Sequence, residues 1–262
     1  MTHHDETLAE LNKAIKQNPQ NAKAFAHRAE FYRQMKCYSE ALTDFNRAID
    51  FQPDYAWAMA HRGVTYRRLM RYEDALADFN RAIDLKSDYA WAIAYRGVIY
   101  VIMGRYQDAV AEYNRAVALD ATLINHWGNE RGFPLLCLGE YAQAIECYKQ
   151  TLTVRRDDAM ALYCLAVTQA HWQGLAKAQT QINQARIVLQ SMVDTQAQGF
   201  YGRDAAFYGL GGLAALKGET KLALNYLQEV ILLEADPNIE MVRHDPAWRD
   251  LRANPRFQAL MA

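Results

Sequence analysis

The sequence predicts an all-α protein that is built as an α-solenoid of stacked helix pairs. A block of 34 residues, 56–89, is followed directly by a second block, 90–123, and the two agree without a gap at half of their positions. In each block apolar and small residues recur at the spacing of one helical face, with a break near its middle. One helix pair cannot bury its own apolar face, whereas stacked pairs can, so the period itself indicates a solenoid.

The first half of the chain divides into regular units. Residues 6–17 place Leu8, Leu11 and Ile15 on one helical face before Asn18-Pro19, so we expect residues 1–21 to form an N-terminal cap or the second helix of an incomplete repeat. Full repeats are predicted over 22–55, 56–89 and 90–123.

The next unit, 124–158, is irregular. It fits the template only with one extra residue near 124–127, and Pro134 falls inside its first predicted helix. An interior proline removes one backbone donor and crowds the preceding turn. We therefore expect a kink, a bulge or a shortened helix in this unit.

Two degenerate units and a tail complete the chain. The units cover 159–195, whose second helix is predicted to extend toward Val193, and 196–236, which begins in a connection over 195–204. Residues 237–262 do not follow the repeat. Their apolar residues are expected to cover the last open helix face as a C-terminal cap; these are Trp248, Leu251, Phe257 and Leu260.

Small and aromatic residues recur at fixed positions of successive blocks. In 56–89 they are Gly63, Tyr66, Tyr72, Ala75, Phe79 and Ala82, and in 90–123 they are Gly97, Tyr100, Tyr106, Ala109, Tyr113 and Ala116. This set resembles the tetratricopeptide repeat (TPR), in a bacterial-type array with a capping tail. The resemblance implies a right-handed superhelix of antiparallel helix pairs, and it does not name a ligand.

Composition limits the function classes. The net charge of −1 gives no global field for nucleic acid or an anionic membrane. No apolar run approaches the roughly 18 residues of a membrane span, and the N-terminus does not read as a secretory signal. We expect a cytoplasmic protein that binds neither membranes nor nucleic acid. The four cysteines form no C-x-x-C motif and are expected to be buried or half-buried free thiols.

The resemblance also implies which residues form a concave groove. In TPR proteins the first helix of each repeat lines this side at repeat positions 2, 5, 6, 9, 12 and 13. Together with a polar cluster in the irregular unit, this predicts a peptide-binding groove lined by Lys23, His27, Arg33, Trp57, His61, Val64, Arg67, Arg68, Trp91, Tyr95, Val98, Ile102, Asn129 and Glu130. A basic edge beside an apolar wall would complement a peptide with an acidic end and an apolar stretch.

Two features of this groove leave alternatives open. Trp57 and Trp91 either present a ligand platform or pack only against the neighbouring first helix. The family's carboxylate clamp is not expected, because Ala26, Glu30 and His61 stand where lysine, asparagine and asparagine would be needed.

Three arginines read as structural. Arg28, Arg62 and Arg96 each lie 16 residues before an acid, namely Asp44, Asp78 and Glu112. Since the two positions lie on paired helices, we predict an ion pair within each repeat.

No motif for catalysis, a metal or a cofactor is present. The glycine-rich stretch from Gly209 lacks the order of a phosphate loop, so its glycines are expected to allow close helix packing. The sequence favours a non-enzymatic adaptor that binds a protein segment. The alternatives are a small-ligand sensor centred on His126–Arg131, or a structural module whose groove is filled by its own tail or by a second copy.

Overall fold

The computed structural model describes residues 3–195, 202–233 and 236–262, with side chains over 6–123, 130–195, 202–233 and 239–262. Within these ranges the chain is helical between its turns and contains no strand. It divides into two compact units, Met1–Ile99 (unit 1) and Tyr100–Ala262 (unit 2). The all-α solenoid predicted from the repeat period is therefore confirmed as an arrangement of consecutive helix pairs.

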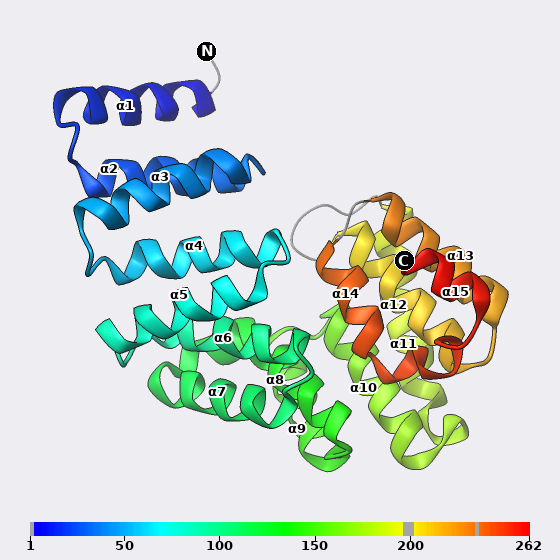
Figure 1. Cartoon of the computed structure of the whole chain (residues 1–262). Coiled ribbons are helices and arrows are strands. Elements are labelled where there is room, and N and C mark those ends of the chain that lie inside the picture. Colours follow the sequence, from blue (N-terminus) through cyan, green and yellow to red (C-terminus); the bar gives the residue numbers. More distant parts are fainter. Residues whose placement is uncertain (1–2, 196–201, 234–235) are drawn as a thin grey trace. The chain divides into compact units, whose positions relative to one another are not determined.

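Unit 1 contains the most regular repeats. Its helices are α1 (His3–Gln17), α2 (Ala22–Gln34), α3 (Tyr38–Phe51), α4 (Ala56–Arg68), α5 (Tyr72–Leu85) and α6 (Ala90–Ile102), which continues into unit 2. The pairs α2–α3 and α4–α5 follow one another, and α4 also packs against α2 and α3 (Figure 1). Each pair thereby buries the face that it could not bury alone.

A signature glycine shows why the pairs approach so closely. A Cβ built on Gly63 of α4 would lie 3.1 Å from the ring of Phe79 in α5. Phe79 is fully buried, as is Phe45 at the same position of the preceding repeat. The small residue and the aromatic ring thus fill one space between paired helices.

The predicted arginine–acid pairs are confirmed in two repeats. Arg28 donates to both carboxylate oxygens of Asp44 at 2.6 and 2.8 Å, and Arg62 does the same to Asp78 at 2.8 and 2.6 Å. The third pair, Arg96 with Glu112, stays a prediction.

Each of these arginines also binds the preceding second helix. Arg28 donates to Asn12, Arg62 to Asn46 and Arg96 to Asn80, always 16 residues back. Asn12 lies in α1, so α1 makes the contact that a second helix makes in the later repeats. This favours the second helix of an incomplete repeat over a separate cap for residues 1–21.

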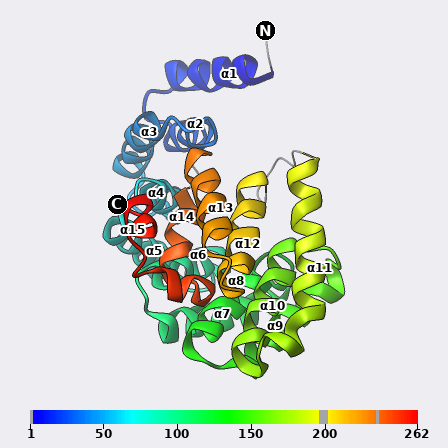
Figure 2. The same ribbon diagram turned by 90° about the vertical axis from the view of Figure 1, so that its right-hand side faces the viewer.

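Unit 2 contains the longer and less regular helices. They are α7 (Tyr106–Leu119), α8 (Ile124–Leu138), α9 (Tyr141–Val154), α10 (Ala159–Gln173), α11 (Leu175–Asp194), α12 (Arg203–Leu216) and α13 (Thr220–Leu232), with a short 3-10 turn, Ala121–Leu123, before α8. α10 packs between α9 and α11 and also contacts α12 (Figure 2). α11 reaches Asp194, which confirms the predicted extension. The connection predicted over 195–204 lies largely outside the described residues.

Of the three alternatives expected around Pro134, the shortened helix is wrong, whereas a kink or a bulge stays a prediction. α8 spans 15 residues and runs through Pro134, whereas α4 and α6 span 13. The extra residue of this repeat is therefore accommodated by a longer first helix, which ends at Gly139 in the left-handed conformation, φ 79°.

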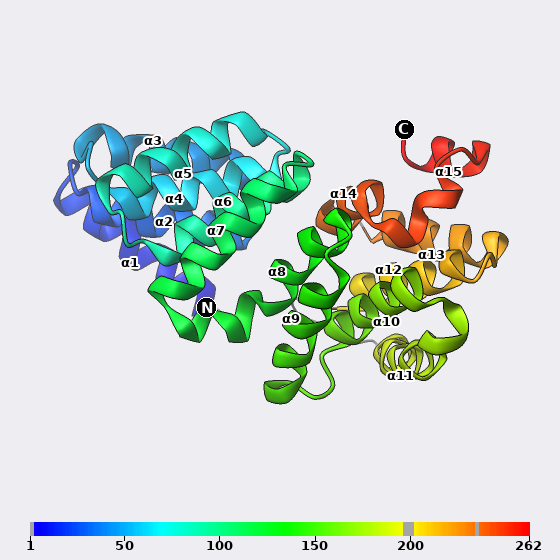
Figure 3. The same cartoon turned by 90° about the horizontal axis from the view of Figure 1, so that it is seen from below.

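The tail consists of α14 (Asp236–His244), a 3-10 helix, η2 (Pro246–Leu251), and α15 (Pro255–Leu260). η2 packs on α12, and α15 packs on α13 (Figure 3). Trp248 is 0% exposed, and Leu251 and Phe257 are also buried. The tail is thus part of the core of unit 2.

Candidate functional site

A column of stacked rings runs across the first helices of unit 1. The rings of Trp57 and His61 in α4 lie 3.9 Å apart, centroid to centroid, at 26°. His61 stacks in turn on Trp91 of α6 at 4.7 Å and 15°, and Trp91 contacts Tyr95 at 4.3 Å. Residues four apart share a helix face, and the 34-residue period sets the next helix alongside, so the repeat itself builds the column.

The column bears on the two alternatives for the tryptophans. Trp57 packs against His27 of α2 at 5.4 Å, and Trp91 packs against His61 of α4, so both indoles contact the neighbouring first helix. Both tryptophans nevertheless stay half-buried. Packing and partial exposure therefore coexist, and a role of these rings as a ligand platform stays a prediction.

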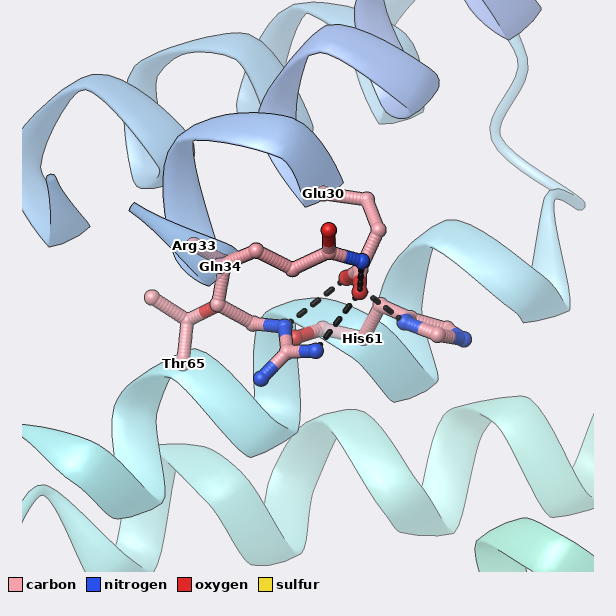
Figure 4. A network of polar contacts seen from close by, with 5 residues as sticks. All are labelled: Glu30, Arg33, Gln34, His61 and Thr65. Atoms are coloured by element: carbon pink, nitrogen blue, oxygen red, sulfur yellow. Dashed lines mark hydrogen bonds and ion pairs between the residues drawn. The ribbon is translucent and has the colours of Figure 1, made fainter. Parts of the chain in front are cut away.

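A carboxylate lies beside the column (Figure 4). Glu30 of α2 accepts hydrogen bonds from Arg33 at 2.8 and 2.6 Å and from Gln34 at 3.0 Å, and it lies 3.0 Å from Nδ1 of His61. Burial alone would raise the pKa of Glu30, but these partners outweigh it and lower the pKa to about 2. Glu30 is therefore ionised at neutral pH.

This network changes the role of two predicted residues. Arg33 was expected to be part of a basic edge and His61 to line the groove, but both side chains contact Glu30. Arg33 lies three residues from Glu30 on the same helix, so this pair could be expected from the sequence. His61 lies 31 residues from Glu30, on another helix. That second contact depends on how α2 and α4 stack.

Comparison with known proteins identifies the repeats. Two family models, both described as tetratricopeptide repeat, match residues 20–88 and 61–123. Residues 20–123 consist of tetratricopeptide repeats. A comparison with curated protein sequences finds no match.

Solved structures share this TPR fold at low sequence identity. A tetratricopeptide repeat protein from Parabacteroides merdae ATCC 43184 is 15% identical, with a TM-score of 0.67 over 97% of this chain and 89% of the other. PilW, described as a type IV pilus biogenesis factor, gives 16% and 0.60 over 92% and 98%. YrrB, described as a TPR protein with an unusual peptide-binding site, gives 21% and 0.58 over 68% and 91%. At these identities the likeness concerns the fold alone.

The remaining predicted groove residues separate into those that the structure leaves accessible and those that it does not. Lys23 and His27 are exposed, and Arg67, Arg68 and Val98 are half-buried. Val64 is only 2% exposed, so its assignment to the groove lining is wrong.

For three other predicted residues the assignment to the groove stays a prediction. Ile102 and Glu130 belong to unit 2, and the side chain of Asn129 lies outside the described residues, as do those of the neighbouring residues from Ile124. Arg131, at the end of the candidate small-ligand cluster, donates to Cys147 Sγ at 3.2 Å. Across the described residues, no group of His, Cys, Asp or Glu side chains is arranged to hold a metal ion.

Charge is segregated between the two helix layers of these TPRs. The first helices α2, α4 and α6 carry seven lysines and arginines against one glutamate. The second helices α3 and α5 carry seven acids against two arginines. Arg28 and Arg62 turn toward second-helix acids, but Lys23, Arg67 and Arg68 share the helix face of the ring column. We call the ring column with these three cations the first-helix face of unit 1.

Other predictions concern unit 2 and the chain as a whole. Cys37, Cys137, Cys147 and Cys164 are free thiols, buried or half-buried as expected. The close packing predicted for the glycine-rich stretch is confirmed, since a Cβ on Gly209 would lie 2.8 Å from Leu189. In the part of the chain that the structure describes, every helix is too short or too polar to cross a membrane.

Proposed function

We propose that this TPR protein is a non-enzymatic adaptor that binds a segment of another protein on the first-helix face of unit 1. The observation that carries the proposal is the half-buried ring column Trp57–His61–Trp91–Tyr95. Large, rigid rings supply much contact area at little entropic cost, and tryptophan and tyrosine dominate the energetics of many interfaces.

The charges around the column suggest the chemistry of the partner. Arg33 balances the charge of Glu30, which also lies 3.0 Å from Nδ1 of His61, while Lys23, Arg67 and Arg68 add positive charge. The guanidinium of Arg67 lies 5.8 Å from the ring centroid of Tyr95, so a cation and a ring adjoin. A protein segment with an acidic end and an apolar stretch would satisfy both features.

Partner capture tests the proposal. The chain is immobilised, exposed to lysate of its source organism, and the retained proteins are quantified by mass spectrometry. We expect Trp91→Ala with Tyr95→Ala to lower recovery of the specific partner by at least about tenfold, because hot-spot rings are removed.

The matched control is Trp172→Ala, which removes an indole that is 49% exposed in unit 2. It should retain the partner. Equal recovery by the parent and by the Trp91/Tyr95 variant, with helical circular dichroism unchanged, would rule out this face as the binding surface.

A further inference from the structure

The tail of unit 2 crosses three first helices in five residues. The carbonyl oxygen of His244 lies 3.9 Å from Cys137 Sγ in α8. Asp245 binds Tyr163 in α10 and Tyr208 in α12. Trp248 reaches Gly211 in α12. A chain that touches successive first helices in this order follows the course of a bound peptide rather than that of another repeat.

Asp245 is the most specific of these contacts. Its Oδ2 accepts hydrogen bonds from the hydroxyls of Tyr163 and Tyr208, both at 2.5 Å, and its Oδ1 accepts from the backbone N–H of Ala247 at 2.8 Å. Asp245 is only 1% exposed. Burial raises the pKa of this carboxyl group, and the two tyrosines counter the rise. A buried carboxylate is tolerated only where donors satisfy it in this way.

The two tyrosines occupy equivalent places in their repeats. Both stand at repeat position 5, which faces the groove in the TPR pattern. In unit 1 that position is held by Ala26, Ala60 and Ala94, each 0% exposed. The pair of hydroxyls is therefore a feature of unit 2, and unit 1 offers no equivalent receptor for an acid.

The glycine-rich stretch of α12 completes the receptor. A Cβ on Gly211 would lie 2.6 Å from the indole of Trp248, and a Cβ on Gly212 would collide with the hydroxyl of Tyr163. One glycine thus leaves room for the tryptophan of the tail, and the next leaves room for a tyrosine that binds the aspartate. The approach at Gly211 involves the tail itself, whereas the approach at Gly212 is close packing between α12 and α10 that positions Tyr163 of the receptor.

We propose that α8, α10 and α12 form an internal peptide-binding site whose ligand is the chain's own segment His244–Leu251, recognised by an aspartate followed three residues later by tryptophan. This site is distinct from the first-helix face of unit 1. While the segment is bound, the receptor formed by Tyr163, Tyr208 and Gly211 is closed to other proteins, and partner binding is confined to unit 1.

Binding in trans tests this proposal. The host is the full chain with Asp245→Ala and Trp248→Ala, whose own segment lacks both recognition side chains. The probe is a fluorescein-labelled synthetic peptide of residues 239–262, followed by fluorescence anisotropy. We expect the peptide to bind the host at least tenfold more tightly than it binds the parent chain, in which the site is occupied. A peptide carrying the same two substitutions should not bind the host.

Equal affinity of the probe for the host and the parent, with the host's helical circular dichroism intact, would overturn the proposal. If the host fails to fold, hydrogen exchange in the chain with Tyr163→Phe and Tyr208→Phe decides instead. Exchange over 244–251 should then rise at least tenfold, while α10 and α12 keep their protection. Equal loss of protection in all three segments would show that the tail unfolds together with the repeats and is not a separately bound ligand.

Discussion

At the scale of single residues, the arginines that recur with the repeat period each link their own helix to two second helices. Arg62 joins Asp78 of its own repeat to Asn46 of the preceding second helix. Its side chain is 19% exposed, and that of Asp78 is 7% exposed. The pair is therefore sheltered enough for the loss of one partner to leave a poorly solvated charge.

We expect Arg62→Met to lower the free energy of unfolding by about 2–4 kcal/mol, because Asp78 stays buried without its charged partner. Methionine keeps most of the packing of the arginine stem. Arg71→Met is the control, since the Arg71–Asp74 pair is about half exposed on both sides and should contribute at most about 1 kcal/mol. Urea unfolding measures both. A loss for Arg62→Met no larger than for Arg71→Met would contradict the prediction.

Glu30 gives the second residue-scale prediction. Its pKa falls from 4.5 in the unfolded chain to about 2 in the folded one. A depressed carboxyl pKa adds stability that is fully present above pH 4.5 and is lost as the pH falls toward 2; here it amounts to about 3 kcal/mol. Glu30→Gln removes this dependence. The gap in urea midpoint between the parent and the variant should therefore narrow between pH 5 and pH 2.5, and a constant gap would argue against the network.

At the scale of elements, the turn between paired helices repeats one backbone conformation. Gly104 and Gly139 adopt positive φ of 70° and 79°, and Lys36 and Met70 hold the same place with φ of 59° and 57°. Side chains other than glycine are strained there. Gly218, between α12 and α13, holds the same place with φ of 75°. Three of these turns thus have glycine at this position, and two do not.

Replacing Lys36 and Met70 by glycine should raise the free energy of unfolding by about 0.5–1 kcal/mol each, since the strain in the turn is relieved. Gly104→Ala is the reciprocal change. Its Cβ would meet nothing within 4 Å, so any loss of stability comes from the backbone alone. Chemical denaturation of the three variants compares them, and destabilisation by Lys36→Gly and Met70→Gly would refute the argument.

Element positions were predictable from sequence because the period places each helix, each glycine and each Arg–Asp pair relative to the next. Contacts between residues that the repeat period does not relate to each other could not be predicted from sequence. The bond from His61 to Glu30 depends on how α2 and α4 stack, and the bonds from Tyr163 and Tyr208 to Asp245 span 82 and 37 residues outside any repeat. The burial of Val64 was not predictable either, because its repeat position predicts exposure whereas it is only 2% exposed.

At the scale of the molecule, the net charge of −1 is a sum over two helix layers of opposite sign in unit 1: the first helices are basic and the second helices acidic. Arg28 and Arg62 form ion pairs with second-helix acids, so these charges of the two layers balance one another. Lys23, Arg67 and Arg68 lie beside the ring column, where an acidic partner would meet them. Long-range attraction from such a layer acts mainly on the rate of association and weakens as salt is added.

Two charge-reversal variants separate this local field from total charge. Lys23→Glu with Arg68→Glu changes two cations of the first-helix face, and Arg47→Glu with Arg81→Glu changes two exposed cations of the second helices. Both lower the net charge by the same amount. If the partner is acidic, association with the captured partner slows about tenfold or more in the first variant and little in the second. Surface plasmon resonance between 50 and 500 mM salt measures this. Equal rates in the two variants, or a rate independent of salt, would show that the rings alone select the partner.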